Sequence, residues 1–560
     1  MFSKFWYNIC YIVEMMKIIF KQKKRELVFF LLVNLLFNLL TFAEETNLPP
    51  LVKISCQPKE GFSPLEVQFS SEGTHDPDGE IVSYFWTFGD GEHSEEAHPK
   101  HVFNYPPAVY FVQLMVVDNK GAVTVSSPLQ IKVRGVEEDI NKKRLIEFQE
   151  KQLRFAYKEE FRLKDLYRSG PYVRGEIDIA GTGFALAGLC VAVEHNLIPF
   201  EKGRDFALAT IMRCLELQRN PQTSFLGFLY HFYIWDQAKE RFSHKEDVEV
   251  STIDTALLLA GMLTAGEYFG GIVREKAEEF YTQINWKGFF DCSKRQFRMA
   301  WKKGNFFGYW DFYTDEILLI SLLAIGAPNP EYRVFPEDAF SGFRVVWGRY
   351  NLGESYVYTW WGSLFTYLYA HMFFDFKKLG PDRFYKIDWW ENTRRAIKAD
   401  IQYCRDEGYP ENVWGLSACW SRTRPKWDEW EYRSDVGGGL SGEGLRYGNK
   451  KNGVWPIAPF ITISCLAFFD LENDLKNNPA FLAFDFMEKN IYNHEGFIIE
   501  SLDANSLDKE GKPQQNCSFV VGMDILTPAL MIENAFSGLI WEYFMRNYYI
   551  KQAVSLVFSS

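Results

Sequence analysis

The sequence lacks the motifs that mark most metal, phosphate and nucleic-acid sites. Nine cysteines occur in 560 residues, but no CxxC pair and no His/Cys group with zinc-ligand spacing is present, so we expect no metal and no other cofactor. The glycine-rich residues 434–444 follow no strand and contain no Gly-Lys-Ser/Thr, which argues against a phosphate-binding loop. The formal net charge of −12 argues against nucleic acid and anionic membranes as partners, because nothing would neutralise their phosphates.

Aromatic residues, in contrast, are abundant. They make up 17% of the chain, with 17 Trp, 29 Tyr and 50 Phe. Some of them must fill a core, and a chain of 560 residues can form two or three domains. So many Trp and Tyr also suit stacking on sugar rings, whose C–H faces match an aromatic face. Cys190, Cys214 and Cys465 lie in apolar helical windows and are expected in the core.

The N-terminal region has the order of an export signal. Residues 17–25 are basic, residues 27–42 form an apolar run, and a small-residue cleavage site follows. This predicts a signal peptide over residues 1–43, with Met15 or Met16 as an alternative start, and a protein exported to the periplasm or beyond. A retained anchor is the alternative, since the apolar run is near the lower length limit for spanning a membrane. No other membrane contact is expected.

A small β module follows the signal region. Short alternating strands and glycine-containing turns occupy residues 49–135, including Asp76-Pro77-Asp78-Gly79. Residues 83–91, with Trp86 at their centre, resemble the central motif of the polycystic kidney disease (PKD) domain, an immunoglobulin-like β-sandwich. In such a domain Trp86 would be a core residue. The charged residues 136–170 carry apolar positions at helical spacing and are interpreted as a helical linker.

Residues 171–550 are predicted to be mainly helical. Several of the apolar windows have no polar side, which is typical of helices buried inside a shell of other helices. An α/α toroid fits this pattern, and such a fold places its site at one mouth, where helix ends and loops meet. The helical windows cover residues 180–194, 202–217, 252–268, 316–325, 364–376, 393–405, 457–471 and 528–545.

Two of these apolar helices begin with carboxylates. Asp254 follows Ser251 in a pattern that also fits a simple capping box. Asp315 and Glu316 follow Thr314 in the same way, where acids also suit the helix dipole. If both helix heads open on one mouth, their carboxylates form the acid and base that glycoside hydrolysis requires.

Further candidates lie in polar and aromatic windows around these helix heads. For any single Trp a core position is an equally good interpretation, and His371 could form a core pair with Asp375, one turn away. The candidates for substrate contact are Glu249, His231, Trp301, Trp360, Trp361, His371, Trp414, Asp435 and Glu443.

Residues 171–550 resemble the glucoamylase-like domain of bacterial β-1,2-glucan-active enzymes, the endo-β-1,2-glucanases of glycoside hydrolase family 144. The segments that carry the resemblance are residues 179–186, 251–261, 313–316, 364–367, 390–396 and 414–418. The resemblance implies an (α/α)6 barrel and hydrolysis with inversion and without a metal. It leaves the substrate open, because a related domain in cyclic glucan synthases transfers sugar chains. Thr314 departs from a compact Tyr-Asp-Glu motif, which puts the role of Asp315 in question.

We therefore expect an exported, monomeric glycoside hydrolase that acts on a β-glucan, most simply a β-1,2-glucan. Glu316 is the predicted general acid, because an apolar helix head should raise its pKa. Asp254 is the predicted base or the residue that holds the water, with Asp315 as a further catalytic candidate. The alternatives are a non-catalytic glycan-binding protein on the same barrel, a transglycosylase, and a polysaccharide lyase.

Overall fold

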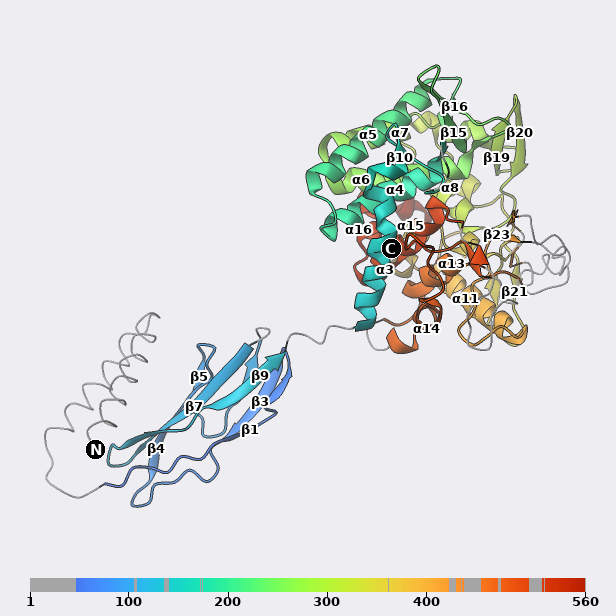
Figure 1. The fold of residues 1–560 in the computed structure, drawn as a ribbon. Coiled ribbons are helices and arrows are strands. Elements are labelled where there is room, and N and C mark those ends of the chain that lie inside the picture. Colours follow the sequence, from blue (N-terminus) through green and yellow to red (C-terminus); the bar gives the residue numbers. More distant parts are fainter. Residues whose placement is uncertain are drawn as a thin grey trace. The chain divides into compact units, whose positions relative to one another are not determined.

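The computed structural model forms two compact units, Met1–Ile140 and Asn141–Ser560, each described here by itself (Figure 1). The described residues are 47–104, 108–134, 140–171, 173, 175–360, 362–422, 430–434, 436–437, 455–471, 475–502, 516–517 and 519–558. The predicted signal peptide at residues 1–43 lies outside them. Within these ranges, no helix is both long and apolar enough to cross a membrane.

The first unit is a two-sheet β-sandwich. One sheet has the order β1 (Ser55–Gln57), β3 (Leu65–Ser70), β6 (Lys100–Phe103). The other has the order β2 (Glu60–Phe62), β9 (Leu129–Arg134), β7 (Ala108–Asp118), β4 (Ile81–Thr87), β5 (His93–Ser94), with β8 (Val123–Val125) also on β7. Trp86 is fully buried, 5.5 Å from the ring of Phe69, which confirms the prediction of a core residue. Gly89 has a φ of +86°, and a Cβ there would lie 3.0 Å from the carbonyl oxygen of Phe111, so this turn requires glycine.

Buried helices occupy the centre of the second unit. They are α4 (Ile179–Glu194), α6 (Thr252–Phe269), α8 (Asp315–Gly326), α13 (Pro459–Ser464) and α15 (Gly522–Phe536). Helix α4 packs against both α6 and α15, and α15 packs against α13. The backbones of α4 and α6 touch, because a Cβ on Gly261 would lie 1.8 Å from the carbonyl oxygen of Gly183.

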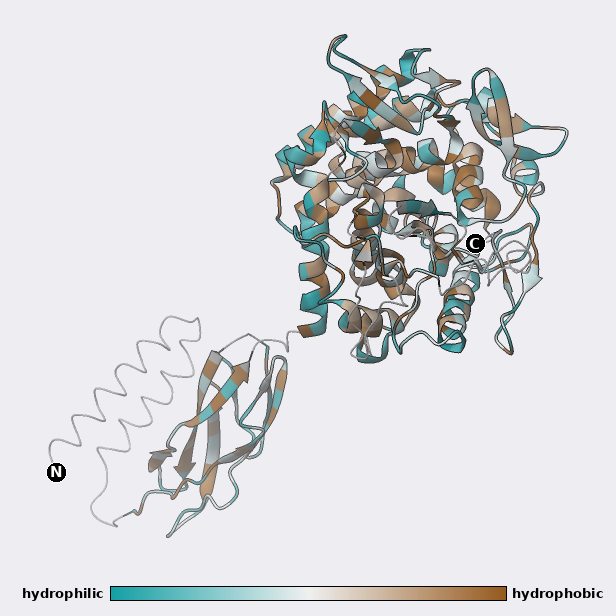
Figure 2. Ribbon diagram, turned by 45° about the vertical axis from the view of Figure 1, so that its right-hand side comes forward, coloured by the Kyte–Doolittle hydropathy of each residue, from teal (hydrophilic) through white to brown (hydrophobic). Residues whose placement is uncertain are grey.

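Amphipathic helices cover this centre, among them α5 (Phe200–Arg219), α7 (Gly271–Thr282) and α17 (Tyr548–Val557). In Figure 2 the apolar colour accordingly concentrates on the inner helices and the polar colour on the outer ones. Helix α3 (Ile140–Tyr157) belongs to this unit: Leu145, Phe148, Leu153 and Phe155 are buried in its core. Residues 140–157 of the predicted linker therefore belong to the helical unit, because the apolar face of α3 packs in its core. Cys190, Cys214 and Cys465 are buried free thiols, as expected of core residues.

Two predicted helical windows differ from the observed helices. Residues 364–376 form only one short turn, η4 (Leu364–Tyr367), and then a series of turns up to α10 (Phe376–Leu379). Residues 528–545 are divided between α15 and α16 (Leu539–Arg546), because Gly538 adopts a left-handed conformation that ends the first helix.

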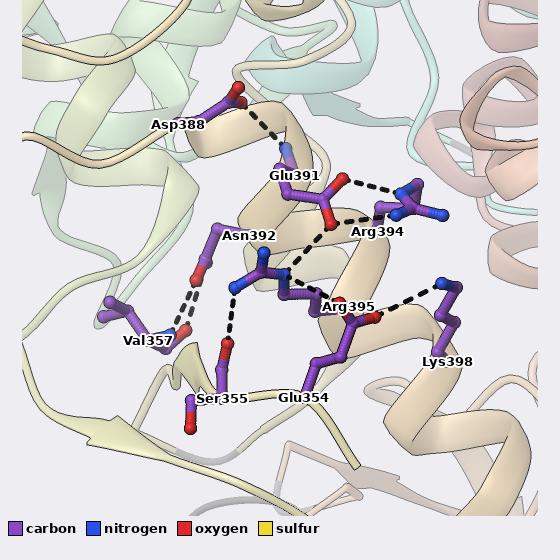
Figure 3. A network of polar contacts seen from close by, with 9 residues as sticks. All are labelled: Glu354, Ser355, Val357, Asp388, Glu391, Asn392, Arg394, Arg395 and Lys398. Atoms are coloured by element: carbon purple, nitrogen blue, oxygen red, sulfur yellow. Dashed lines mark hydrogen bonds and ion pairs between the residues drawn. The ribbon is translucent and has the colours of Figure 1, made fainter.

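Helix α11 (Trp389–Asp406) fixes the hairpin formed by β21 (Trp347–Gly348) and β22 (Tyr356–Val357) (Figure 3). The buried Asn392 accepts from the N–H of Val357 at 2.6 Å and donates to its carbonyl at 3.1 Å. At the surface, Arg395 donates to the carbonyl of Ser355 at 3.0 Å, and Lys398 lies 3.3 Å from Glu354. The buried amide contributes more to this anchoring than the exposed ion pair does, since water screens the latter.

Candidate active site

Four carboxylates stand at the N-terminal ends of four inner helices. Asp178 caps α4, while Asp254, Glu316 and Asp524 lie in the first turns of α6, α8 and α15. Helix N-termini stabilise negative charge, so each helix offers a favourable position for an acid. The charges act on one another: Asp254 on Asp178 and Glu316, and Asp178 on Asp524. The heads of these helices therefore face one common site.

Glu316 is the acid best placed to hold a proton. Its helix is capped by Thr314, whose Oγ1 accepts the N–H of Ile317 at 3.3 Å. The pKa of Glu316 is raised to about 8, chiefly because its side chain is desolvated and next because Asp254 is negatively charged. At neutral pH Glu316 is consequently protonated and can donate its proton to a substrate oxygen.

Asp254 does not complete a capping box. Ser251 caps α6, since its Oγ accepts the N–H of Asp254 at 3.3 Å. The carboxylate of Asp254 turns instead toward His231, with 3.5 Å between Oδ1 and Nε2. Asp254 is 9% exposed, and this remaining surface leaves the acid accessible from the site.

His231 is surrounded by acids. Its Nδ1 lies 3.7 Å from Oε1 of Glu249, on the side opposite Asp254. Burial opposes its charged form, but Asp254, Glu249 and Asp178 outweigh this and raise the pKa of His231 to about 9. Hydrogen bonding to His231 in turn lowers the pKa of Glu249.

Asp178, His231 and Asp254 are the only three described acids, histidines or cysteines whose ligand atoms all lie within 4.8 Å of one another. Oδ1 of Asp178 already accepts the N–H of Ala180 at 2.9 Å, as the cap of α4. Burial raises the pKa of Asp178 to about 6, against the opposing effect of His231. The group thus combines two acids with a cationic imidazole, and the expectation that no metal is needed stays a prediction.

A second pair of acids, Glu500 and Asp524, was not predicted from the sequence. Glu500 is 1% exposed, and its Oε1 accepts the N–H of Trp420 at 3.1 Å. Each of the two carboxyl groups acts on the pKa of the other, so they lie close together. Burial raises the pKa of Glu500 to about 7 and that of Asp524 well above its ordinary value. Asp524 escaped prediction because the helix was expected to begin at Pro528, whereas it begins at Gly522.

Tyr369 lies near acids of both groups. Its hydroxyl is buried, and its pKa is raised by burial and then by the charges of Asp524, Glu316 and Asp178, among others. Nothing in the sequence indicated that Tyr369 lies near these acids, because residues 364–376 were predicted as one continuous helix.

Asp315 and His371 are structural residues. Both side chains are 0% exposed. Oδ2 of Asp315 accepts from Nδ1 of His371 at 2.9 Å and from the N–H groups of Ala370 and His371 at 2.7 and 3.0 Å. Full burial of both side chains argues against the assignment of Asp315 to catalysis and of His371 to substrate binding. The pair His371/Asp375 does not form either, since Asp375 is bound to Lys378 at 2.8 Å.

The predicted aromatic contacts separate into two groups. Trp414 is buried and belongs to the core. Trp301 and Trp360 are half-buried; Trp301 stacks on Phe225 at 4.3 Å, and Trp360 packs on Phe312 at 5.7 Å. Strand β19 (Gln296–Lys302) pairs Trp301 with Val250, next to the first turn of α6, so Trp301 lies beside the site. Three further candidates, Trp361, Asp435 and Glu443, lie outside the described residues.

Comparison with known proteins identifies both units. Residues 308–548 match the family described as "Putative glucoamylase", and residues 47–133 match the PKD domain family. The helical unit is thus similar to the glucoamylase family over residues 308–548. This confirms the family resemblance drawn from the sequence.

Among curated proteins, an exo β-1,2-glucooligosaccharide sophorohydrolase of Parabacteroides distasonis is 21% identical to this chain over 434 residues. The match covers 68% of this chain but only 53% of that relative, so the chain spans about half of its length.

Solved structures show the same fold at low identity. A β-1,2-glucanase from Parabacteroides distasonis has a TM-score of 0.58 at 15% identity, covering 92% of this chain and 74% of that one. An endo-β-1,2-glucanase from Chitinophaga pinensis, in complex with sophorotriose and glucose, has a TM-score of 0.58 at 15% identity, covering 75% and 99%.

Proposed function

We propose that this protein is a glycoside hydrolase that cleaves β-glucan, specifically β-1,2-glucan, with inversion at the anomeric carbon. The observation that carries the proposal is the pair Glu316 and Asp254, a half-buried carboxylic acid near a carboxylate that faces a histidine. The β-1,2-glucan substrates in the names of the relatives support the linkage. The partner is accordingly an oligo- or polysaccharide.

The reaction follows from these protonation states. Glu316 gives its proton to the glycosidic oxygen as the bond from that oxygen to the anomeric carbon breaks. A water molecule attacks the same carbon from the opposite face, and a carboxylate takes the proton that this water loses. The product carries the new hydroxyl in the inverted configuration.

Asp254 is our candidate for this base, because its neighbour His231 is cationic and favours an ionised carboxylate. Asp524 is the second candidate. It stands in the first turn of α15, and Glu500 and Asp178 both act on its pKa, so it belongs to the same group of acids.

Two further features belong to the proposal. We infer that the inner helices, from α4 and α6 round to α13 and α15, close into the inner ring of an (α/α)6 barrel. We also infer export, because basic, apolar and small-residue segments follow one another before the β-sandwich.

To test this, purified protein is incubated with a panel of glucans of defined β-linkage. NMR then follows which anomer of the product is released. We expect β-1,2-linked oligosaccharides to be cleaved with release of the α-anomer. Release of the β-anomer would contradict inversion, and a longer oligosaccharide among the products would indicate transglycosylation. An unsaturated uronate, detected by its ultraviolet absorption, would indicate a lyase, and binding without turnover would indicate a glycan-binding protein.

A further inference from the structure

The ring of His231 is held in place by groups of the protein itself. The backbone N–H of His231 donates to the carbonyl of Glu249 at 3.0 Å, and its carbonyl accepts from the N–H of Ile179 at 3.3 Å. The ring stacks on Phe232, with centroids 3.7 Å apart and planes inclined by 20°. His231 is thus fixed between the heads of α4 and α6 without any substrate.

Each nitrogen of this ring faces a carboxylate. Nε2 lies 3.5 Å from Asp254 and Nδ1 lies 3.7 Å from Glu249, while Asp178 approaches from the head of α4. A neutral imidazole has one N–H donor and one acceptor, and an acceptor nitrogen would be repelled by a carboxylate oxygen. Two carboxylates on opposite nitrogens therefore select the imidazolium, which carries an N–H on both nitrogens.

We propose that His231 is a positioning residue: its imidazolium, held from behind by Glu249, holds the carboxylate of Asp254 in place in the site while Glu316 carries the proton. The inference rests on the proposed function for its catalytic consequence, and it adds the means by which two neighbouring acids are given opposite roles. Neither Glu249 nor His231 needs to touch the substrate for this.

The charges around the site explain why such a cation is required. Asp178, Asp254 and Glu316 are near enough for the charge of Asp254 to act on the other two. Without a cation among them, mutual repulsion would distribute protons over several of these acids instead of onto Glu316 alone. A further cation, Lys302, acts on Glu249 and lowers its pKa.

The first experiment measures the protonation of His231 directly, in the full chain and without substrate. With ¹⁵N-labelled histidine, NMR should show both ring nitrogens of His231 protonated from pH 6 to pH 8. Glu249→Gln should lower the pH at which the ring loses its proton. A His231 that is neutral at pH 7 would overturn the proposal, as would Zn²⁺ at micromolar concentration binding to the ring nitrogen in place of the proton.

The second experiment uses the pH dependence of kcat/KM on the glucan that the enzyme hydrolyses. His231→Gln should move the acidic limb of the profile to higher pH by about one unit or more, the size of effect expected of an opposite charge at this distance. Glu249→Gln should move it in the same direction by less. An unchanged acidic limb in His231→Gln protein would contradict the positioning role, whatever the change in overall rate.

A matched control is His195→Gln. His195 lies at the other end of α4 and is also paired with two acids, Glu533 at 2.9 Å and Glu150 at 3.7 Å. Its loss should lower the melting temperature and leave the pH profile unchanged. If no glucan is hydrolysed, the proposed function fails, while the NMR titration still decides whether His231 is the fixed cation of this cluster.

Discussion

Asp315 and Glu316 are consecutive residues whose carboxyl groups lie in opposite environments. Oδ2 of Asp315 accepts three hydrogen bonds from residues 370–371, and the side chain is fully buried. Glu316, one residue further along α8, is half-buried at the site, and burial with the nearby Asp254 raises its pKa to about 8. Asp315 anchors the helix head to the segment at residue 370, and this anchor holds Glu316 in position.

Replacement of Glu316 by Gln should lower kcat by about 10²- to 10⁴-fold, the usual contribution of a general acid. The same variant should be more stable than the parent at pH 8. The pKa of Glu316 is raised from 4.5 to about 8, so the parent loses stability as the pH rises from about 4.5 to 8, and Gln avoids this loss. Melting temperatures at pH 5 and pH 8 measure the difference, and equal differences at both pH values would contradict the raised pKa.

Replacement of Asp254 by Asn should leave the melting temperature nearly unchanged, because Ser251 caps α6. Its kcat should fall by orders of magnitude if Asp254 is the base. The double variant with Glu316→Gln should be little slower than either single one, since residues that act as a unit are not additive. Turnover of Asp254→Asn protein close to that of the parent would end its catalytic role.

Asp524→Asn distinguishes the two candidate bases. Added azide can attack the anomeric carbon without a base, so it should restore product formation, as a glycosyl azide, only in the variant that has lost the base. We expect this rescue for Asp254→Asn and not for Asp524→Asn. The reverse result would assign the base to the pair Asp524 and Glu500.

The stability that His231 provides should depend on pH. Its pKa is raised from 6.5 to about 9, so its contribution is fully present below pH 6.5 and is lost as the pH rises through about 9. His231→Gln should therefore lower the melting temperature more at pH 6 than at pH 10. A difference that is independent of pH would mean that the ring acts by packing alone.

Deletion of residues 1–139 should leave turnover of soluble oligosaccharides unchanged, because every acid of the candidate site belongs to the second unit. The measurement is kcat/KM of the shortened protein, with circular dichroism to verify that it is folded. A folded but inactive protein would mean that the β-sandwich contributes to the site.

The positions of Asp254 and Glu316 could be predicted because each acid lies in the first turn of a helix with no polar side. Asp178 and Asp524 occupy equivalent positions but were not selected, and for Asp524 an internal proline hid the helix start. Glu500 could not be found by this pattern, because it lies just before the short strand β25 (Ser501–Leu502) and meets Asp524 only through tertiary packing. The structural role of His371 also depends on a contact between distant segments, which local periodicity does not contain.

The contact between Gly183 and Gly261 fixes how closely α4 and α6 approach each other beneath the candidate active site. Gly261 lies two turns along α6 from Asp254, and Gly183 lies in the second turn of α4, after Asp178. Direct backbone contact between α4 and α6 thus fixes the spacing of Asp178 and Asp254. A methyl group at residue 261 would push the two helices apart. Residue 261 therefore tolerates no side chain without a shift of α4 or α6.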